Sequence, residues 1–307
     1  MPISINRDKK VFDESGVTYV IGERISSIAN NVTIYEVKGR EDVIYVEAAD
    51  LHENRYDVRK MSTQSINEAG FEKLLWPERL VKKENSSAYS GFISRNPQIR
   101  GDLVLLAEII EERKEKKKLS NEESHYYLNL GLQLAEIIEL VHRCGYVVGS
   151  LSPDKFWVSR EGIVYSCVSY QFSYRDIDAF DNPYYVAPEW LSKMNIEAVV
   201  YNTQSDSFLY ALILFQLFTG KYPFVPERDV LAVEKETLWE AMTDGKSLYF
   251  FEDKQMMDCI TQELSVFPTG IEKLFTRTFD YCGYEDYAES RPSIQDWLLA
   301  LRLGSDC

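Results

Sequence analysis

The chain has 307 residues, of which 45% are hydrophobic, and its formal net charge at pH 7 is −15. This length allows a large buried core, whereas the negative field would repel the phosphates of nucleic acids and of anionic membranes. We therefore expect no nucleic-acid partner and no membrane partner, and a protein partner with a basic surface fits the charge.

The cysteines and the apolar runs give no sign of a metal site or a membrane span. The five cysteines are odd in number, widely spaced and without a C-x-x-C pair, which argues against a disulfide framework and a zinc site. No charged-then-apolar leader opens the chain, and the longest apolar run, 208–218, contains Gln216 and is too short to span a membrane. These features predict a cytoplasmic protein.

The first third of the chain is rich in β-forming runs. After a turn at I-S-S-I-A-N-N (25–31) the pattern continues as strands, and a K-K-E-N-S-S turn separates the last two. The spacing of apolar residues over 58–76 predicts a helix. The predicted strands cover residues 17–22, 32–37, 42–48, 76–81 and 88–95.

The remainder of the chain is predominantly helical in pattern. An apolar run at 103–110 leads into E-E-R-K-E-K-K-K (111–118), where lysines alternate with glutamates as on a solvated helix face. Ser120 followed by Glu123 forms a capping box that starts a long helix ending at Gly145. His142 lies near the end of this helix, where the helix dipole favours a positive charge.

Three motifs follow this helix at a distinctive spacing. They are V-G-S-L-S-P-D-K-F-W-V (148–158), V-S-Y (168–170) and A-P-E (187–189). The layout resembles the catalytic half of a eukaryotic-type protein kinase, in which H-R-D-L-x-x-x-N, D-F-G and A-P-E occur in this order. The resemblance implies an α+β, bilobal, protein-kinase-like fold as a single domain over 1–307, with a β-rich N-lobe (1–97) and a mainly helical C-lobe (98–307).

The residues that carry kinase chemistry are replaced at the matching positions, so no catalytic residue is expected to be intact. Serine is a poor base, valine cannot bind a metal ion and lysine repels one. The phosphate-binding glycines are also missing from the turn at 25–31, near which Gly22 is the only glycine. Glu47 replaces the strand lysine, Ser150 the catalytic aspartate, Ser152 the lysine that steadies the transferred phosphate, Lys155 the metal-binding asparagine and Val168 the D-F-G aspartate.

The adenine pocket of the family is also expected to be closed. In the family a small residue two positions before the strand lysine lies above the adenine, and an aliphatic residue two positions after the asparagine lies beneath it. The matching residues are Tyr45 and Trp157, and strand alternation places Tyr45 on the same face as Glu47. We therefore expect two rings in place of the nucleotide, with no cofactor and no metal ion.

The residues that hold the family's scaffold together are present. Glu189 and Arg291 match a buried ion pair, and Asp206 matches the aspartate that anchors the backbone of the catalytic loop. The run 209–224 resembles the central buried helix and its T-G-x-x-P-F turn. The resemblance therefore implies a pseudokinase, a scaffold or allosteric regulator of a protein partner such as a kinase or another signalling protein.

Two alternatives remain open. One is an enzyme that uses the fold for unconventional nucleotide chemistry, with ligands recruited from Asp154, Asp178, Asp181 or Glu47. The other is a sensor that binds ATP without turnover. The sequence does not decide whether Tyr184 or Tyr185 is phosphorylated.

Overall fold

The computed structural model describes residues 9–28, 32–48, 51, 55–63, 71–97, 103–149, 151–166, 184–191, 201–225, 234–244, 247, 254–279 and 290–305. The chain divides into two compact units. Unit 1 comprises Met1–Leu103 and Tyr165–Phe172, and unit 2 comprises Val104–Val164 and Ser173–Cys307. Unit 2 thus begins at Val104, and the described residues Tyr165 and Ser166 belong to unit 1.

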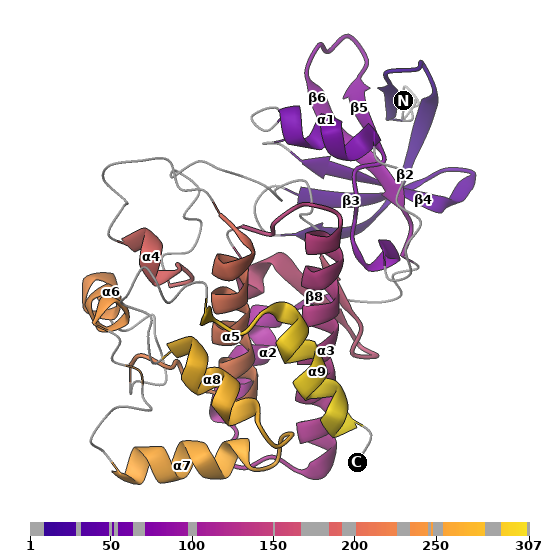
Figure 1. Cartoon of the computed structure of the whole chain (residues 1–307). Helices are drawn as coiled ribbons and strands as arrows, with labels where there is room; N and C mark the ends of the chain where they lie inside the picture. The colour runs from indigo at the N-terminus through magenta and orange to yellow at the C-terminus, as the bar shows by residue number, and fades with distance from the viewer. Residues whose placement is uncertain are drawn as a thin grey trace. The chain divides into compact units, whose positions relative to one another are not determined.

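The described strands of unit 1 form a closed antiparallel barrel (Figure 1). Closure depends on β1, which pairs with β2 on one side and with β5 on the other. β1 was not predicted, because its four residues carry too short an alternating pattern. In barrel order the strands are β1 (Lys10–Asp13), β2 (Thr18–Ile28), β3 (Val32–Val37), β4 (Arg40–Ala48), β6 (Tyr89–Arg95) and β5 (Arg79–Lys83).

Two details of unit 1 differ from the sequence prediction. The strand β2 continues through Ile28 and pairs there with Val32, so the first residues of the predicted turn at 25–31 are strand. The predicted helix 58–76 is also shorter: α1 covers Arg55–Thr63, and a 3-10 turn covers Phe71–Lys73. Leu75 then donates a backbone hydrogen bond to the Ser166 carbonyl, and Pro77 disfavours helical backbone at Trp76.

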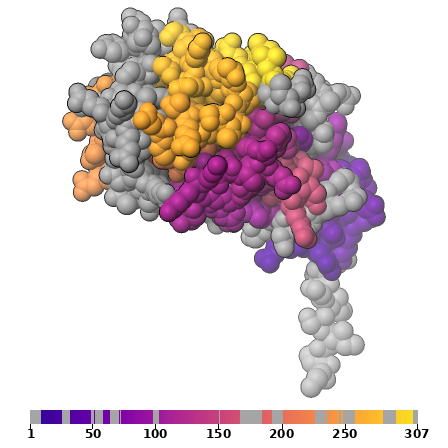
Figure 2. Space-filling model, turned by 90° about the horizontal axis from the view of Figure 1, so that it is seen from below, coloured from indigo at the N-terminus to yellow at the C-terminus, as the bar shows by residue number. Residues whose placement is uncertain are grey.

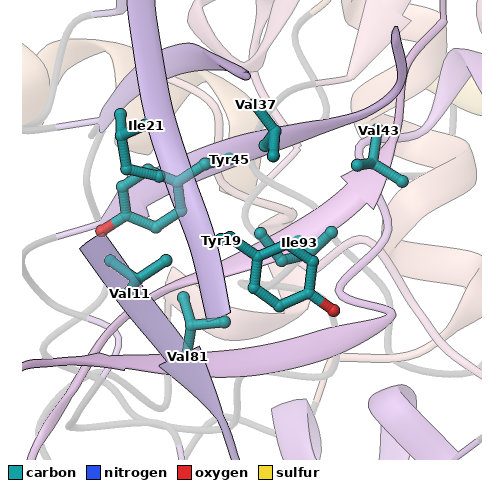
Figure 3. Packing of buried hydrophobic residues seen from close by; sticks show 8 residues of the cluster. All are labelled: Val11, Tyr19, Ile21, Val37, Val43, Tyr45, Val81 and Ile93. Carbon is teal, nitrogen blue, oxygen red and sulfur yellow. The ribbon is translucent and has the colours of Figure 1, made fainter. Parts of the chain in front are cut away.

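The interior of the barrel is filled by apolar side chains from its strands (Figure 3). Gly91 of β6 is required in this core, because a Cβ atom there would collide with the Val46 carbonyl oxygen and the Tyr45 ring. Close approach of β4 and β6 therefore depends on a residue without a side chain. The cluster contains Val11, Tyr19, Ile21, Val37, Val43, Tyr45, Val81 and Ile93.

Unit 2 is built around α5 (Thr203–Thr219), which is buried from Ser205 to Thr219. Asn202 caps its start by accepting hydrogen bonds from the Gln204 and Ser205 backbone, and Gly220 ends it in left-handed conformation with φ 66°. The helix begins before residue 209, where the prediction placed it. α5 packs against α2 (Leu106–Glu115), α3 (Asn121–Arg143), α7 (Lys254–Leu264) and α8 (Ile271–Phe279).

The remaining elements of unit 2 complete this helical layer. α9 (Ile294–Ser305) packs along α3 (Figure 1). The predicted helix at 103–110 begins as a strand, β7 (Leu103–Leu105), which joins a sheet in the order β7-β8-β9. The capping box of Ser120 and Glu123 is confirmed at the start of α3. The other described elements of unit 2 are the 3-10 turn η2 (Pro153–Lys155), β8 (Phe156–Ser159), α4 (Pro188–Leu191) and α6 (Lys235–Thr243). The last two residues of β9 (Val164–Ser166) belong to unit 1.

Candidate functional site: a kinase-like site with replaced chemistry

Glu47, which the motif spacing matched to the family's strand lysine, is held by two lysines. Lys9 Nζ lies 3.0 Å from Glu47 Oε1 and 2.9 Å from Oε2, and Lys83 Nζ lies 2.8 Å from Oε1. Burial opposes ionisation of Glu47, but the hydrogen bonds from Lys83 and Lys9 outweigh it and lower the pKa of the carboxyl group. The carboxylate is therefore charged at neutral pH, and both of its oxygens are occupied.

Tyr45 lies elsewhere than predicted. Its ring belongs to the core of the barrel (Figure 3). The ring also stacks on that of Tyr35, with 5.9 Å between the ring centroids. Its hydroxyl donates to Ser90, and burial raises the pKa of Tyr45. Because the barrel closes, the strand face that the prediction assigned to an adenine pocket is here an interior face of unit 1.

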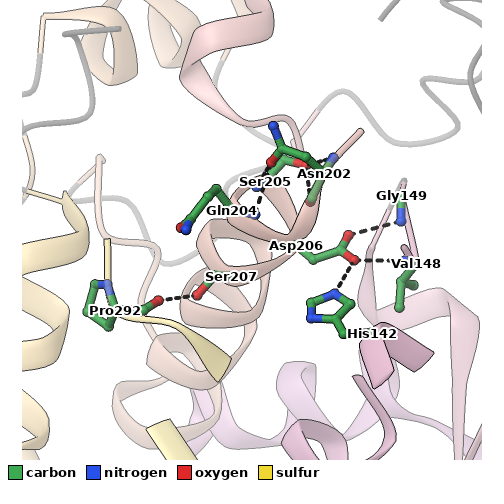
Figure 4. A network of polar contacts seen from close by, with 9 residues as sticks. All are labelled: His142, Val148, Gly149, Asn202, Gln204, Ser205, Asp206, Ser207 and Pro292. Atoms are coloured by element: carbon green, nitrogen blue, oxygen red, sulfur yellow. Dashed lines mark hydrogen bonds and ion pairs between the residues drawn. The ribbon is translucent and has the colours of Figure 1, made fainter. Parts of the chain in front are cut away.

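Asp206 anchors the backbone before the catalytic-loop position, as Figure 4 shows. Its Oδ2 accepts a hydrogen bond of 2.7 Å from the Val148 N–H, and its Oδ1 accepts one of 2.9 Å from the Gly149 N–H. Gly149 has φ 80°, a conformation that favours glycine. The fully buried carboxylate thus fixes a turn that another residue type would strain.

His142 is a residue whose role the sequence analysis missed. Its Nε2 lies 2.8 Å from Asp206 Oδ2, so its partner is a carboxylate of α5 and not only the helix dipole (Figure 4). The two residues are 64 positions apart, and no local pattern links them. The resemblance pointed to Asp206 but not to this histidine.

The other described positions of the kinase-like motif are buried. Lys155 ends the 3-10 turn η2 and is 5% exposed, Ser152 is fully buried, and Trp157 lies buried in β8. The Ser152 Oγ and one oxygen of Asp154, a residue proposed for the alternative chemistry, have no hydrogen-bond partner within the described part of the chain. Ser150, Val168, Asp178 and Asp181 lie outside the described residues.

Glu189 and Arg291, expected from the resemblance to form a buried ion pair, contact each other. Arg291 donates through Nη1 and Nη2 to the two carboxylate oxygens, at 2.9 and 2.8 Å. The two side chains are 11% and 3% exposed. The guanidinium also lies 4.9 Å from the centre of the Phe208 ring, so the pair joins α4, α5 and the segment before α9.

Tyr185 is enclosed within unit 2. Its hydroxyl donates to Gln216 Oε1 at 3.0 Å and accepts from Gln216 Nε2 at 2.8 Å. Burial raises the pKa of Tyr185, and the ring packs edge-on against Tyr222. In this conformation the hydroxyl is committed to Gln216 and is not presented to a modifying enzyme.

Metal-binding and membrane-spanning features are absent from the residues that the structure describes. No group of three or more histidine, cysteine, aspartate or glutamate side chains comes together there as a metal site would require. None of the described helices combines the length and the apolar character needed to cross a membrane.

Comparison with known proteins places the fold. No protein-family model matches the sequence, and no curated protein matches it. Among solved structures, the chain is similar to a Toxoplasma gondii specific rhoptry antigen kinase domain, with a TM-score of 0.61 and 14% identity over 98% of this chain and 87% of that one. The chain therefore has a protein-kinase-like fold, in which the closed barrel of unit 1 is a distinctive feature.

Proposed function

We propose that this chain is a catalytically inactive kinase-like module that scaffolds or regulates a protein partner. The observation that carries the proposal is that β4, the strand matched to the lysine-bearing strand of the family, contains no lysine. In an active kinase the strand residue is a lysine that pairs with the nucleotide phosphates. Here the strand bears a carboxylate whose oxygens are already bound by Lys9 and Lys83.

The catalytic-loop side of the motif supports the same proposal. A lysine at position 155 brings a positive charge to the place where the family binds Mg²⁺, and cations repel each other at short range. Val168, at the position of the second metal ligand, has no donor atom. An ordinary kinase mechanism needs both ligands, and the described residues offer no replacement cluster.

The catalytic residues of the motif are replaced, whereas the buried polar contacts that hold the fold together are kept. This contrast argues for a binding role. Asp206 still holds the turn at Gly149, and Glu189 still pairs with Arg291. These buried charges would be costly if their partners were missing. A chain that retains them without the catalytic groups retains a folded surface for recognition.

The first test is phosphoryl transfer by the full chain. We expect no label from γ-labelled ATP on the protein itself or on a general acceptor, with Mg²⁺ or Mn²⁺, because the metal positions hold Lys155 and Val168. Ser150→Ala serves as the matched control. Labelling by the unmodified chain that disappears in this variant would refute the inactive assignment and favour unconventional chemistry.

The second test addresses the partner. A protein recovered with the intact chain should re-form a defined complex from purified components, and the partner's own activity should change when the complex forms. Neither effect should require ATP. A complex that forms only with ATP would instead support the sensor alternative.

A further inference from the structure

A pocket in unit 2 lies away from the kinase-like motif. It encloses about 320 Å³ between α7 and the connector that joins α2 to α3. Figure 2 shows a face of the molecule on which the α7–α8 region, in orange, borders the α2–α3 region, in magenta. Its lining includes Arg113, Lys117, Lys118, Leu119, Glu263 and Val266.

The connector side of the pocket is held in a fixed shape. Arg113 donates to the Lys116 carbonyl at 2.9 Å and to the Phe218 carbonyl at 2.6 Å. Lys116 donates to Glu123 at 2.6 Å, and Glu123 closes the capping box with Ser120. Lys117 and Lys118 therefore project from a short segment that is anchored at both ends.

The α7 side of the pocket is also held by specific side-chain contacts. Lys221 bonds both oxygens of Glu263, each at 2.7 Å, so the carboxylate in the lining is already neutralised. Phe267, which lies next in sequence to this side, stacks its ring on that of Phe218, with 3.7 Å between their centroids. This wall offers no uncompensated negative charge from Glu263.

The charges of the pocket favour an anion. Lys117 and Lys118 make no hydrogen bond or ion pair with the residues that the structure describes, and both are exposed. The buried Arg113 adds a third cation, whose Nε has no partner in the same part of the chain. Three cations beside one neutralised carboxylate form a positive site on a chain whose net charge is −15.

The lining also provides apolar surface. Leu119 lies on the connector and Val266 lies beyond α7, where its side chain is 49% exposed. A pocket of this size accommodates a small molecule or one terminal side chain. An inorganic anion alone would leave this apolar surface in contact with water.

We propose that this pocket binds a small carboxylate with an apolar body, the chemistry shared by an organic acid and the last residue of a peptide. The carboxylate pairs with Lys117 and Lys118, and the apolar body covers Leu119 and Val266. This site is separate from the kinase-like motif, so the proposal goes beyond the proposed function and does not depend on it.

The test uses Cys259, which lines the pocket and carries a free, exposed thiol. Alkylation of Cys259 by iodoacetamide is followed by mass spectrometry of its peptide in the full chain. We expect 4-phenylbutyrate to slow this alkylation in a saturable manner, while acetate and the uncharged 4-phenylbutan-1-ol protect weakly. Calorimetric titration of the same three probes measures binding without relying on the thiol.

Lysine variants and added salt separate the contribution of charge pairing to ligand binding from the contribution of apolar contacts. Lys117→Ala combined with Lys118→Ala should weaken phenylbutyrate binding by about fivefold, as expected for two exposed charge pairs. The charge-matched control, Lys10→Ala combined with Lys273→Ala, changes lysines outside the lining and should bind as the unmodified chain does. Raising the salt concentration should weaken binding.

The two possible sources of the ligand are distinguished by a short peptide with a C-terminal phenylalanine and its amidated form. Tighter binding of the free-acid peptide than of phenylbutyrate indicates a peptide terminus, and the reverse order indicates an organic acid. Equal protection by phenylbutyrate and phenylbutanol would overturn the proposal, as would unchanged binding in the Lys117/Lys118 double variant or the absence of any binding at 10 mM probe.

Discussion

Arg291 and Glu189 illustrate how single residues secure this fold. Both charges are largely removed from water, and each satisfies the other through two hydrogen bonds. Asp206 follows the same rule with two backbone N–H groups and His142. At the residue scale, stability depends on each buried polar group finding its hydrogen-bond or ion-pair partners.

Breaking the Glu189–Arg291 pair should be costly. Glu189→Leu or Arg291→Met leaves the other charge buried without its partner and should reduce the free energy of unfolding by about 3–5 kcal/mol. The combined Glu189→Leu and Arg291→Met change should cost less than the sum of the single changes. Urea unfolding of the four proteins measures this coupling, and additive losses would mean that the two side chains act independently.

Glu123 should contribute to stability in an acid-dependent manner. The hydrogen bonds from Lys116 and Ser120 lower the pKa of Glu123 from 4.5 to about 2 in the folded chain. The group's contribution is therefore present above pH 4.5 and is lost as the pH falls from 4.5 toward 2.

Glu123→Gln should remove this pH-dependent contribution. Between pH 4.5 and 2, the variant should lose less of its unfolding free energy than the unmodified chain, as measured by chemical unfolding at each pH. Glu122→Gln is the matched control, because it makes the same change in the same helical turn. Identical pH profiles for Glu123→Gln and the unmodified chain would contradict the assignment.

At the scale of elements, barrel closure explains the packing of unit 1. β1 supplies the pairings that join β2 to β5, and Gly91 allows β4 and β6 to approach. Closure gives the edge strands partners, which removes exposed backbone groups. It also places the Tyr45 ring in the core and brings Lys9 and Lys83 to Glu47.

Gly91→Ala should destabilise the barrel. The added Cβ atom would meet the Val46 carbonyl and the Tyr45 ring, so relief requires displacement of a strand, at about 1–3 kcal/mol. Gly22→Ala is the comparison, because its tightest contact is the exposed Glu36 side chain, at 3.0 Å. Thermal unfolding should show the larger loss for Gly91→Ala, and equal losses would exclude a special role for the β4–β6 approach.

For the molecule as a whole, a protein-kinase-like fold persists at 14% identity to the Toxoplasma kinase domain. The residues that maintain this fold in unit 2 are separate from those that kinases use for chemistry. The positive pocket at the α2–α3 connector is also separate from the motif.

ATP should not stabilise the chain. Since β4 contains no lysine and Lys155 is matched to the metal-binding asparagine, we expect millimolar ATP to leave the melting temperature unchanged with or without Mg²⁺. A nucleotide at 100 times its dissociation constant would add about 2.7 kcal/mol. An ATP-induced rise in melting temperature that is lost when Lys83→Ala removes one cation would favour the sensor alternative.

The sequence alone determined the features that depend on residue type or on near neighbours. The capping box of Ser120 and Glu123 spans one helical turn, and the alternation of buried and partly exposed residues in β3 spans a few residues. The matching of Glu47 and Lys155 to kinase positions rests on motif spacing and stays a prediction. Local hydrogen bonding and side-chain periodicity suffice for such inferences.

The contacts that join distant segments followed from the tertiary structure alone. Lys9 reaches Glu47 across 38 positions, and His142 reaches Asp206 across 64, because strand pairing and helix packing bring them together. Because the barrel closes, Tyr45 lies in the core and not in the predicted nucleotide pocket. The positive pocket forms where α7 lies against the α2–α3 connector. Such contacts depend on the path of the whole backbone, so a local sequence pattern does not predict them.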